Sequence, residues 1–138
     1  MKTCHIVLFV IITAIAFGCS GGGDSYDATL CHSLALKVER HEDLTQRDYQ
    51  LMISQNEQIL KYLVDQAEQI DHTPEIDRGQ AWRSLTANPD YMERFGYLFT
   101  LGSALYDANL NGLLDEANAS RYHDLDEYNE RLGDYSER

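Results

Sequence analysis

The sequence predicts an all-α protein, a compact antiparallel bundle of four to five helices. From Ser25 onward, apolar residues recur with the helical period of about 3.6 positions. Capping residues, prolines and glycines divide this pattern into segments of helical length. No stretch shows the strict apolar–polar alternation or the hairpin turns that a β-sheet requires.

Charge and length limit the functions that the chain can have. It has 138 residues, with 11 Lys and Arg against 23 Asp and Glu, a formal net charge of −12. The length is that of one domain. Binding to nucleic acid needs clustered cations, so we expect no nucleic-acid partner, and electrostatic adsorption to anionic lipid is disfavoured for the same reason.

The first predicted helix spans about 25–41 and carries Leu30, Leu34 and Val38 on one side. A second helix begins at Thr45, a good N-cap, with Asp48 at the third helical position, where an acid suits the positive end of the helix dipole. Its apolar face runs through Tyr49, Met52, Ile53, Ile59, Leu60, Leu63, Ala67 and Ile70. Asn56 interrupts this face, either as a partnered polar residue that fixes register or as a rim position.

Two further helices are predicted to begin at prolines. Thr73-Pro74-Glu75 starts a third helix, with Pro74 at the first helical position, which runs to about Ala87. Asn88-Pro89-Asp90 repeats this signature and starts a fourth helix. The fourth helix has an apolar face that we expect to pack in the bundle, with Gly102 allowing a neighbouring helix to approach closely. That face consists of Tyr91, Met92, Phe95, Leu98, Phe99, Gly102, Leu105 and Tyr106.

The turn at 109–112 ends the fourth helix, and a fifth helix is predicted from about Leu113. One side of it carries Leu114, Ala117, Arg121, Leu125, Tyr128 and Leu132.

The N-terminal residues have the features of an export signal. Lys2 precedes an almost unbroken apolar run from Ile6 to Phe17. As a helix this run spans only ~18 Å, well short of the ~30 Å hydrocarbon core of a membrane. A removable signal therefore fits better than a transmembrane helix.

The segment Ala16-Phe17-Gly18-Cys19 resembles the lipobox of bacterial lipoprotein precursors. The resemblance implies cleavage before Cys19 and attachment of lipid to its thiol, with 1–18 as the cleaved signal, 19–24 as the lipidated cysteine and a glycine-rich tether, and 25–138 as a single helical domain. The resemblance also implies that the protein belongs to the bacterial cell envelope and binds a membrane through the lipid on Cys19. Ser20, a residue other than Asp after the cysteine, favours the outer over the inner membrane within this class.

Loss of the signal removes Cys4, and lipid occupies Cys19, so Cys31 is left alone. It lies beside Leu30 and Leu34 on the apolar side of the first helix, and we expect it to be a buried core residue.

One motif has the spacing of a cation site. The segment 107–118 follows one predicted helix and precedes another, as an EF-hand loop does, with Asp107, Asn109 and Asn111 at positions 1, 3 and 5. Asp115 stands at position 9, and the carbonyl of Leu113 would supply a further oxygen. Position 12 is Asn118 instead of a bidentate acid, so the calcium affinity should be weak. The same residues are also good turn chemistry between antiparallel helices, with Asn111 as a cap.

No other pattern marks a reaction centre. The histidines are scattered without metal-ligand spacing, and no serine stands in a nucleophile motif. The leading hypothesis is a membrane-tethered, non-catalytic helical domain that binds another envelope protein. The alternatives are a weak calcium-binding module at 107–118 and an envelope hydrolase whose carboxylate site is not visible in the sequence.

Substitution Cys19→Ser tests the anchor. We expect the product to lose the mass of the lipid and to leave the membrane fraction, because two or three acyl chains at ~0.8 kcal/mol per buried methylene are what hold it there. Mass spectrometry and fractionation measure both changes. A product of unchanged mass that stays with the membranes contradicts the lipoprotein interpretation.

Overall fold

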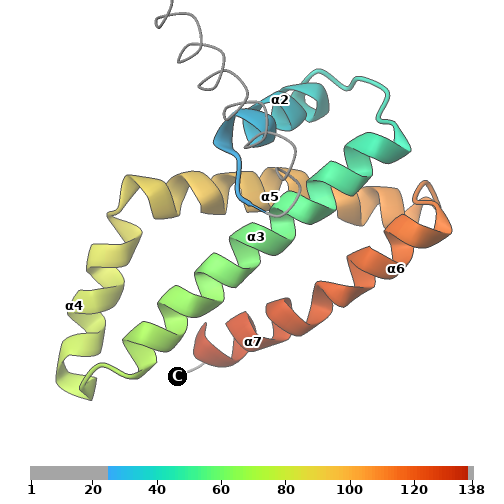
Figure 1. Cartoon of the computed structure of the whole chain (residues 1–138). Helices are drawn as coiled ribbons and strands as arrows, with labels where there is room; N and C mark the ends of the chain where they lie inside the picture. The colour runs from blue at the N-terminus through green and yellow to red at the C-terminus, as the bar shows by residue number, and fades with distance from the viewer. Residues whose placement is uncertain (1–24, 137–138) are drawn as a thin grey trace, which may run out of the picture.

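The computed structural model describes residues 25–136, and all regular secondary structure in this part of the chain is helical (Figure 1). The helices are α2 (Ala28–Glu39), α3 (Gln46–Asp71), α4 (Glu75–Thr86), α5 (Pro89–Leu110), α6 (Glu116–Asp124) and α7 (Asp126–Ser136). They pack against each other, so the predicted all-α bundle is confirmed. The predicted signal at 1–18 and the lipidated cysteine and tether at 19–24 lie outside the described residues. None of the helices between 25 and 136 combines the length and the apolarity that crossing a membrane requires.

Local capping explains where several helices begin. Thr45 caps α3 through a reciprocal capping box with Asp48, as the sequence predicts. Asn88 caps α5 and Pro89 is its first residue, which also confirms the prediction. Helix α4 begins at Glu75, so Pro74 occupies its N-cap instead of the predicted first helical position. Pro74 provides no side-chain cap.

Helix α3 is the centre of the bundle. It contacts each of the other five described helices, and in Figure 1 it runs diagonally across α5. Its buried apolar side chains supply most of the core, namely Tyr49, Met52, Ile53, Ile59, Leu60, Leu63, Val64, Ala67 and Ile70. This set includes every apolar residue that the sequence places on the predicted face.

Helix α5 packs through only part of the predicted face: Leu105 is buried and Tyr91 and Leu98 pack against the core, as predicted. Leu101, Leu105 and Ala108 are its buried residues. Four members of the predicted face, Met92, Phe95, Phe99 and Tyr106, are exposed to solvent. The prediction fails for these four because α5 is apolar on two sides, and α2 and α3 cover only one of them.

The predicted fifth helix is divided in two. Leu125 separates α6 from α7, although its backbone keeps α-helical angles, and its buried side chain joins the core. Helix α6 begins at Glu116 rather than near Leu113, because Asp115 caps it by accepting a hydrogen bond from the backbone N–H of Asn118.

Buried Gln55 on α3 holds the start of the described chain. Its Oε1 accepts hydrogen bonds from the Asp27 backbone N–H at 2.8 Å and from the Cys31 thiol at 3.4 Å. Its Nε2 donates to the Ser25 carbonyl at 3.0 Å. Cys31 is fully buried, as predicted, and burial, with smaller contributions from the charges of Asp27 and Glu93, raises the pKa of its thiol to about 12.

Cation–π contacts of Arg94 with two tyrosine rings attach the start of the described chain at a second point. The guanidinium of Arg94 on α5 lies 4.3 Å from the ring centre of Tyr26 and 4.2 Å from that of Tyr62 on α3. The Tyr26 hydroxyl also donates to Glu93 Oε1 at 2.8 Å. The segment that follows the predicted tether is therefore fastened to both α3 and α5.

Substitution Asp48→Asn should reduce stability in a pH-dependent way. Burial raises the pKa of Asp48, but hydrogen bonds from Lys37 and Thr45 outweigh it and leave this pKa below its ordinary value. A carboxyl with a lowered folded-state pKa stabilises the protein above its unfolded pKa of ~3.9, and this stabilisation is lost as the pH falls through the folded-state pKa.

We expect the variant to be less stable than the wild type by about 2 kcal/mol at pH 7 and the difference to shrink below pH ~4. Urea unfolding at pH 7 and at lower pH measures it, with the exposed Glu42→Gln as control. An equal difference at both pH values contradicts the assignment.

Candidate functional site

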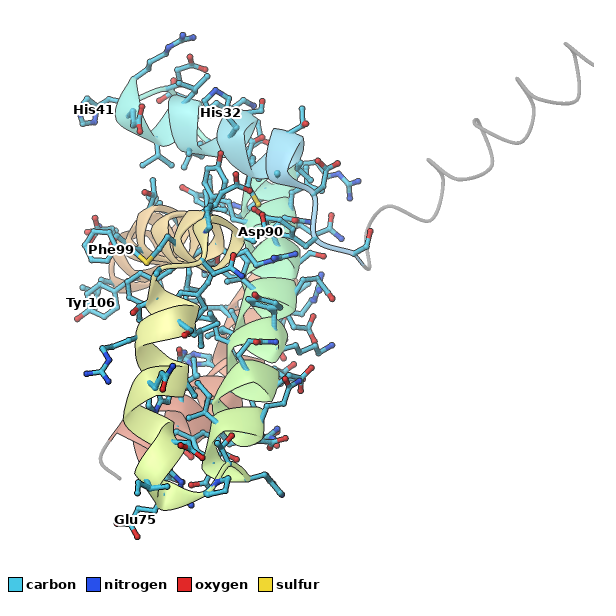
Figure 2. The ribbon with its side chains drawn as sticks, turned by 90° about the vertical axis from the view of Figure 1, so that its left-hand side faces the viewer. His32, His41, Glu75, Asp90, Phe99 and Tyr106 are labelled. Atoms are coloured by element: carbon cyan, nitrogen blue, oxygen red, sulfur yellow. The ribbon has the colours of Figure 1, made fainter. Side chains whose placement is uncertain are left out.

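The outer side of α5 presents a row of large apolar side chains to solvent. We call the α5 stripe the set of Met92, Phe95, Phe99, Tyr106 and Leu110 on this helix, Leu113 in the turn that follows it, and Gly102 and Ser103 in their middle. The six large side chains are about half exposed or more, up to 72% for Phe99. Figure 2 shows Phe99 and Tyr106 projecting from α5 on the side away from α3.

Charge is sparse along the α5 stripe. Between 91 and 113 the charged residues are Glu93, Arg94 and Asp107. Arg94 is turned inward, between two tyrosine rings. In a chain with 25% charged residues, this makes the α5 stripe distinct from the rest of the surface. Contiguous exposed apolar patches of more than a few hundred Å² mark interaction sites in soluble domains.

A groove borders the α5 stripe. Helices α5 and α6–α7 diverge from the turn at 111–115, and both pack on α3 (Figure 1). Between them lies a cavity of about 460 Å³. Its lining comes from α3, α5, α6 and α7 and consists of Asn56, Leu60, Leu98, Phe99, Gly102, Ser103, Tyr106, Asp107, Tyr122, Leu125 and Asn129. Phe99 and Tyr106 therefore belong both to the α5 stripe and to the wall of the groove.

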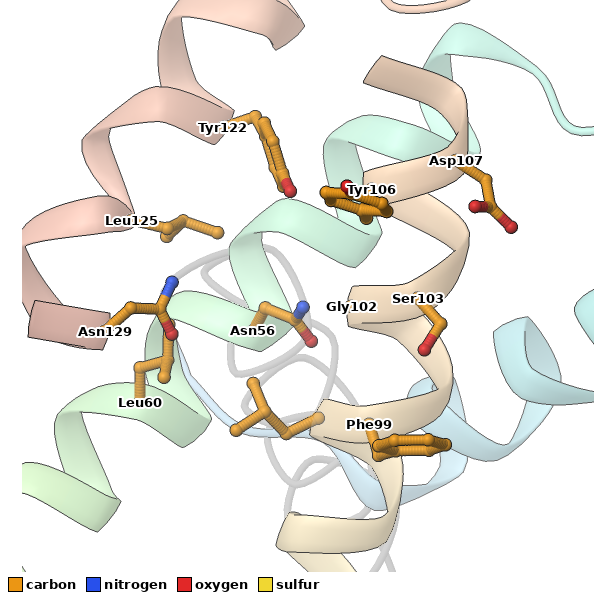
Figure 3. A pocket seen from close by; sticks show the side chains of 11 residues that line it. Asn56, Leu60, Phe99, Gly102, Ser103, Tyr106, Asp107, Tyr122, Leu125 and Asn129 are labelled. Carbon is orange, nitrogen blue, oxygen red and sulfur yellow. The ribbon is translucent and has the colours of Figure 1, made fainter. Parts of the chain in front are cut away.

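Asn56 forms the floor of this groove and has an unsatisfied polar atom. The residue is only 3% exposed, and its Oδ1 has no hydrogen-bond partner. Figure 3 shows its side chain between Gly102 on α5 and Asn129 on α7. Of the two predicted interpretations, a partnered polar residue or a rim position, neither describes it. A ligand that brings a hydrogen-bond donor into the groove would find in this oxygen an acceptor that no protein group uses.

Gly102 gives access to Asn56 from the side of α5. A Cβ atom at position 102 would lie 3.5 Å from Asn56 Nδ2, an ordinary van der Waals contact, so the packing of α3 on α5 does not itself require the glycine that the sequence predicts to permit a close approach. Because Gly102 has no side chain, the amide of Asn56 is covered by backbone alone at this point.

The predicted calcium ligands lie at the end of α5, in the turn that follows it and at the N-cap of α6. Asp107 and Asn109 belong to the last turn of α5, and two residues so spaced on a helix point in nearly opposite directions. Asn111 is the C-cap of α5, and its Nδ2 donates to the Asp107 carbonyl at 2.8 Å. It therefore ends α5, whereas the sequence suggested that it caps the following helix.

The second half of the 107–118 segment is engaged in capping and packing. Asp115 Oδ1 accepts from the Asn118 backbone N–H at 2.8 Å. The Leu113 carbonyl accepts from Gln46 Nε2 at 2.6 Å, and Gln46 Oε1 accepts from the Asp115 backbone N–H at 2.9 Å. Among residues 25–136, no group of three or more His, Cys, Asp and Glu side chains is placed to hold a metal ion. Calcium binding remains a prediction of the sequence that these contacts do not favour.

Three acids line a second hollow, and one of them, Glu57, forms ion pairs with basic side chains. This hollow of about 450 Å³, between α3 and α6–α7, has Glu57, Asp124 and Glu127 in its lining. Glu57 lies 3.1 Å from Lys61 Nζ and 3.9 Å from an Arg121 nitrogen.

The fold and the groove define a class: an all-α bundle with one helix face left apolar and open. Comparison of the chain with protein-family models, curated proteins and solved structures finds no match.

Two neighbouring amides on α3 provide a test of the unsatisfied group. Gln55→Leu removes three hydrogen bonds, a buried one with Cys31 and two partly buried ones with the backbone of Ser25 and Asp27, so we expect a loss of about 2–3 kcal/mol in the free energy of unfolding. Asn56→Leu removes an amide whose Oδ1 has no partner within the protein, so we expect a change within about 1 kcal/mol of zero. Urea titration compares the two variants. A strongly destabilised Asn56→Leu would mean that this amide supports the fold rather than a binding event.

Proposed function

We propose that this protein is a small bacterial envelope lipoprotein, anchored by lipid on Cys19, whose non-catalytic helical domain binds another protein through the α5 stripe and its groove. The observation that carries the proposal is the row of exposed side chains centred on Phe99 and Tyr106. Leaving this much apolar surface in water is unfavourable, and a bound partner removes the cost.

The lipobox-like segment supports the anchor, and Ser20 favours the outer membrane. A tether of five residues spans only ~12 Å on average. The described domain starts at Ser25, which α3 holds through Gln55. Tyr26 is bound to Glu93 and Arg94 in the second turn of α5, so the α5 stripe begins near the point where the tether joins the domain.

A protein partner fits the α5 stripe better than a lipid surface does. Helices that lie on membranes flank their apolar face with Lys and Arg. The only basic residue of α5 is Arg94, which is held between Tyr26 and Tyr62. The proposed lipid on Cys19 would also make a second membrane contact unnecessary.

Site-specific cross-linking tests the proposed function. A photo-reactive phenylalanine analogue at Phe99 should yield a discrete cross-linked protein product in intact cells, because this side chain lies in the proposed contact. The same analogue at Ile76 is the matched control, since Ile76 is 91% exposed and apolar but lies on α4, outside the α5 stripe. Gel analysis of membrane fractions measures the products. Equal yields at the two positions, or none at Phe99, contradict a binding role of the α5 stripe.

A further inference from the structure

The α5 stripe has a spacing that reads the same in both directions. From the peptide bond between Gly102 and Ser103, the large apolar positions lie at equal distances toward each end. Phe99 mirrors Tyr106, Phe95 mirrors Leu110, and Met92 mirrors Leu113. A two-fold interface requires such self-complementarity, because each residue must meet its counterpart on an identical surface.

We propose that the α5 stripe binds a second copy of this chain, with the two α5 helices crossing antiparallel about a two-fold axis at Gly102–Ser103. This inference rests on the proposed function and names the partner. In the pair, Phe99 of each copy packs against Tyr106 of the second copy. The contact between Phe95 and Leu110 repeats on both sides of the axis, and Met92 packs near the turn that carries Leu113 of the second copy.

The area available is sufficient for such a dimer. An aromatic side chain presents 150–250 Å² in full, so half-exposed residues of this size each contribute on the order of 100 Å². The six large side chains of the α5 stripe then offer ~600 Å², and the small residues between them bring it toward the ~800 Å² per partner of a standard interface.

The crossing point is built from small residues. Gly102 and Ser103 leave room for two helix backbones to approach to about 8 Å. In the antiparallel pair Ser103 of the second copy stands opposite Gly102, so no large side chain separates the two helices at the crossing point.

The acids near the α5 stripe do not oppose the pairing directly. Under the same symmetry Asp107 lies opposite Leu98 of the second copy, and Glu93 lies opposite Gly112 of the second copy. The negative charge of the two domains repels mainly at long range, which 0.15 M salt screens beyond about 8 Å. Dimerisation should therefore strengthen with added salt.

Cysteine cross-linking of the full chain in non-ionic detergent tests the proposal. In Ser103→Cys the new thiol lies beside the two-fold axis, so mild oxidation should produce a disulfide-linked species of twice the chain mass. Ser84→Cys is the matched control, an exposed serine on α4. The wild type controls for Cys19 and Cys31. We expect at least tenfold more dimer from position 103 than from position 84.

A charge pair tests the direction of the helices. Added to Ser103→Cys, Phe99→Glu should lower the dimer yield at least tenfold, and Ile76→Glu should leave it unchanged. Adding Tyr106→Lys to Phe99→Glu should restore the dimer, because Glu and Lys then face each other across the antiparallel seam. A parallel pair would set Glu against Glu and would not recover.

Equal yields from positions 103 and 84, or no loss with Phe99→Glu, overturn self-association. Failure of Tyr106→Lys to restore the dimer overturns the antiparallel arrangement.

The two proposals can fail separately. If the analogue at Phe99 captures only a different protein in cells while the Ser103→Cys variant stays monomeric, the second copy is excluded and the proposed function stands. If neither experiment yields a product, both proposals fail. Binding of the unlipidated Cys19→Ser chain to neutral phosphatidylcholine vesicles, lost in Phe99→Glu, would assign the α5 stripe to lipid and overturn both.

Discussion

Burial of one face of α3 is the interaction on which the rest of the structure depends. This helix contacts every other described helix, and its apolar side chains fill the centre of the bundle. Because α5 and α6–α7 both pack on α3 and diverge from the same turn, a groove remains between them. Two consecutive amides of α3 then have opposite consequences: Gln55 fastens the start of the chain, and Asn56 leaves an unsatisfied oxygen in the groove.

Helix α5 links this core to the proposed binding surface. Its inner side contributes Leu101 and Leu105, while its outer side exposes Phe99 and Tyr106. A helix that is apolar on all sides is usually buried on all sides. The bundle covers one side of α5 only, and no other element between residues 25 and 136 covers the other. In the proposed complex, a partner covers the exposed apolar surface of α5 and the groove that Asn56 lines.

The distribution of charge fits this arrangement. The acidic residues lie largely outside the α5 stripe and keep the domains apart through long-range repulsion, which favours solubility. In the proposed complex, the partner therefore contacts only the uncharged α5 stripe. Specificity for this surface then comes from the exclusion of charged surfaces as well as from packing. Arg94, the one basic residue of α5, is used inside the molecule to fasten Tyr26. The attachment of Tyr26 and the proposed interface therefore belong to the same helix, α5.

The sequence by itself determined the helices and most of their ends, because periodicity and capping act within a few residues. The capping box of Thr45, the Asn88–Pro89 start and the buried face of α3 all follow from such local rules. Only the tertiary structure decided which side of α5 is covered, because both sides carry apolar residues and local spacing does not reveal where neighbouring helices lie. The EF-hand-like spacing of the 107–118 segment likewise did not reveal that Asn111 ends α5 and Asp115 caps α6. Asn56 was noticeable in the sequence as an interruption, but its lack of a partner depends on how α5 and α7 frame it.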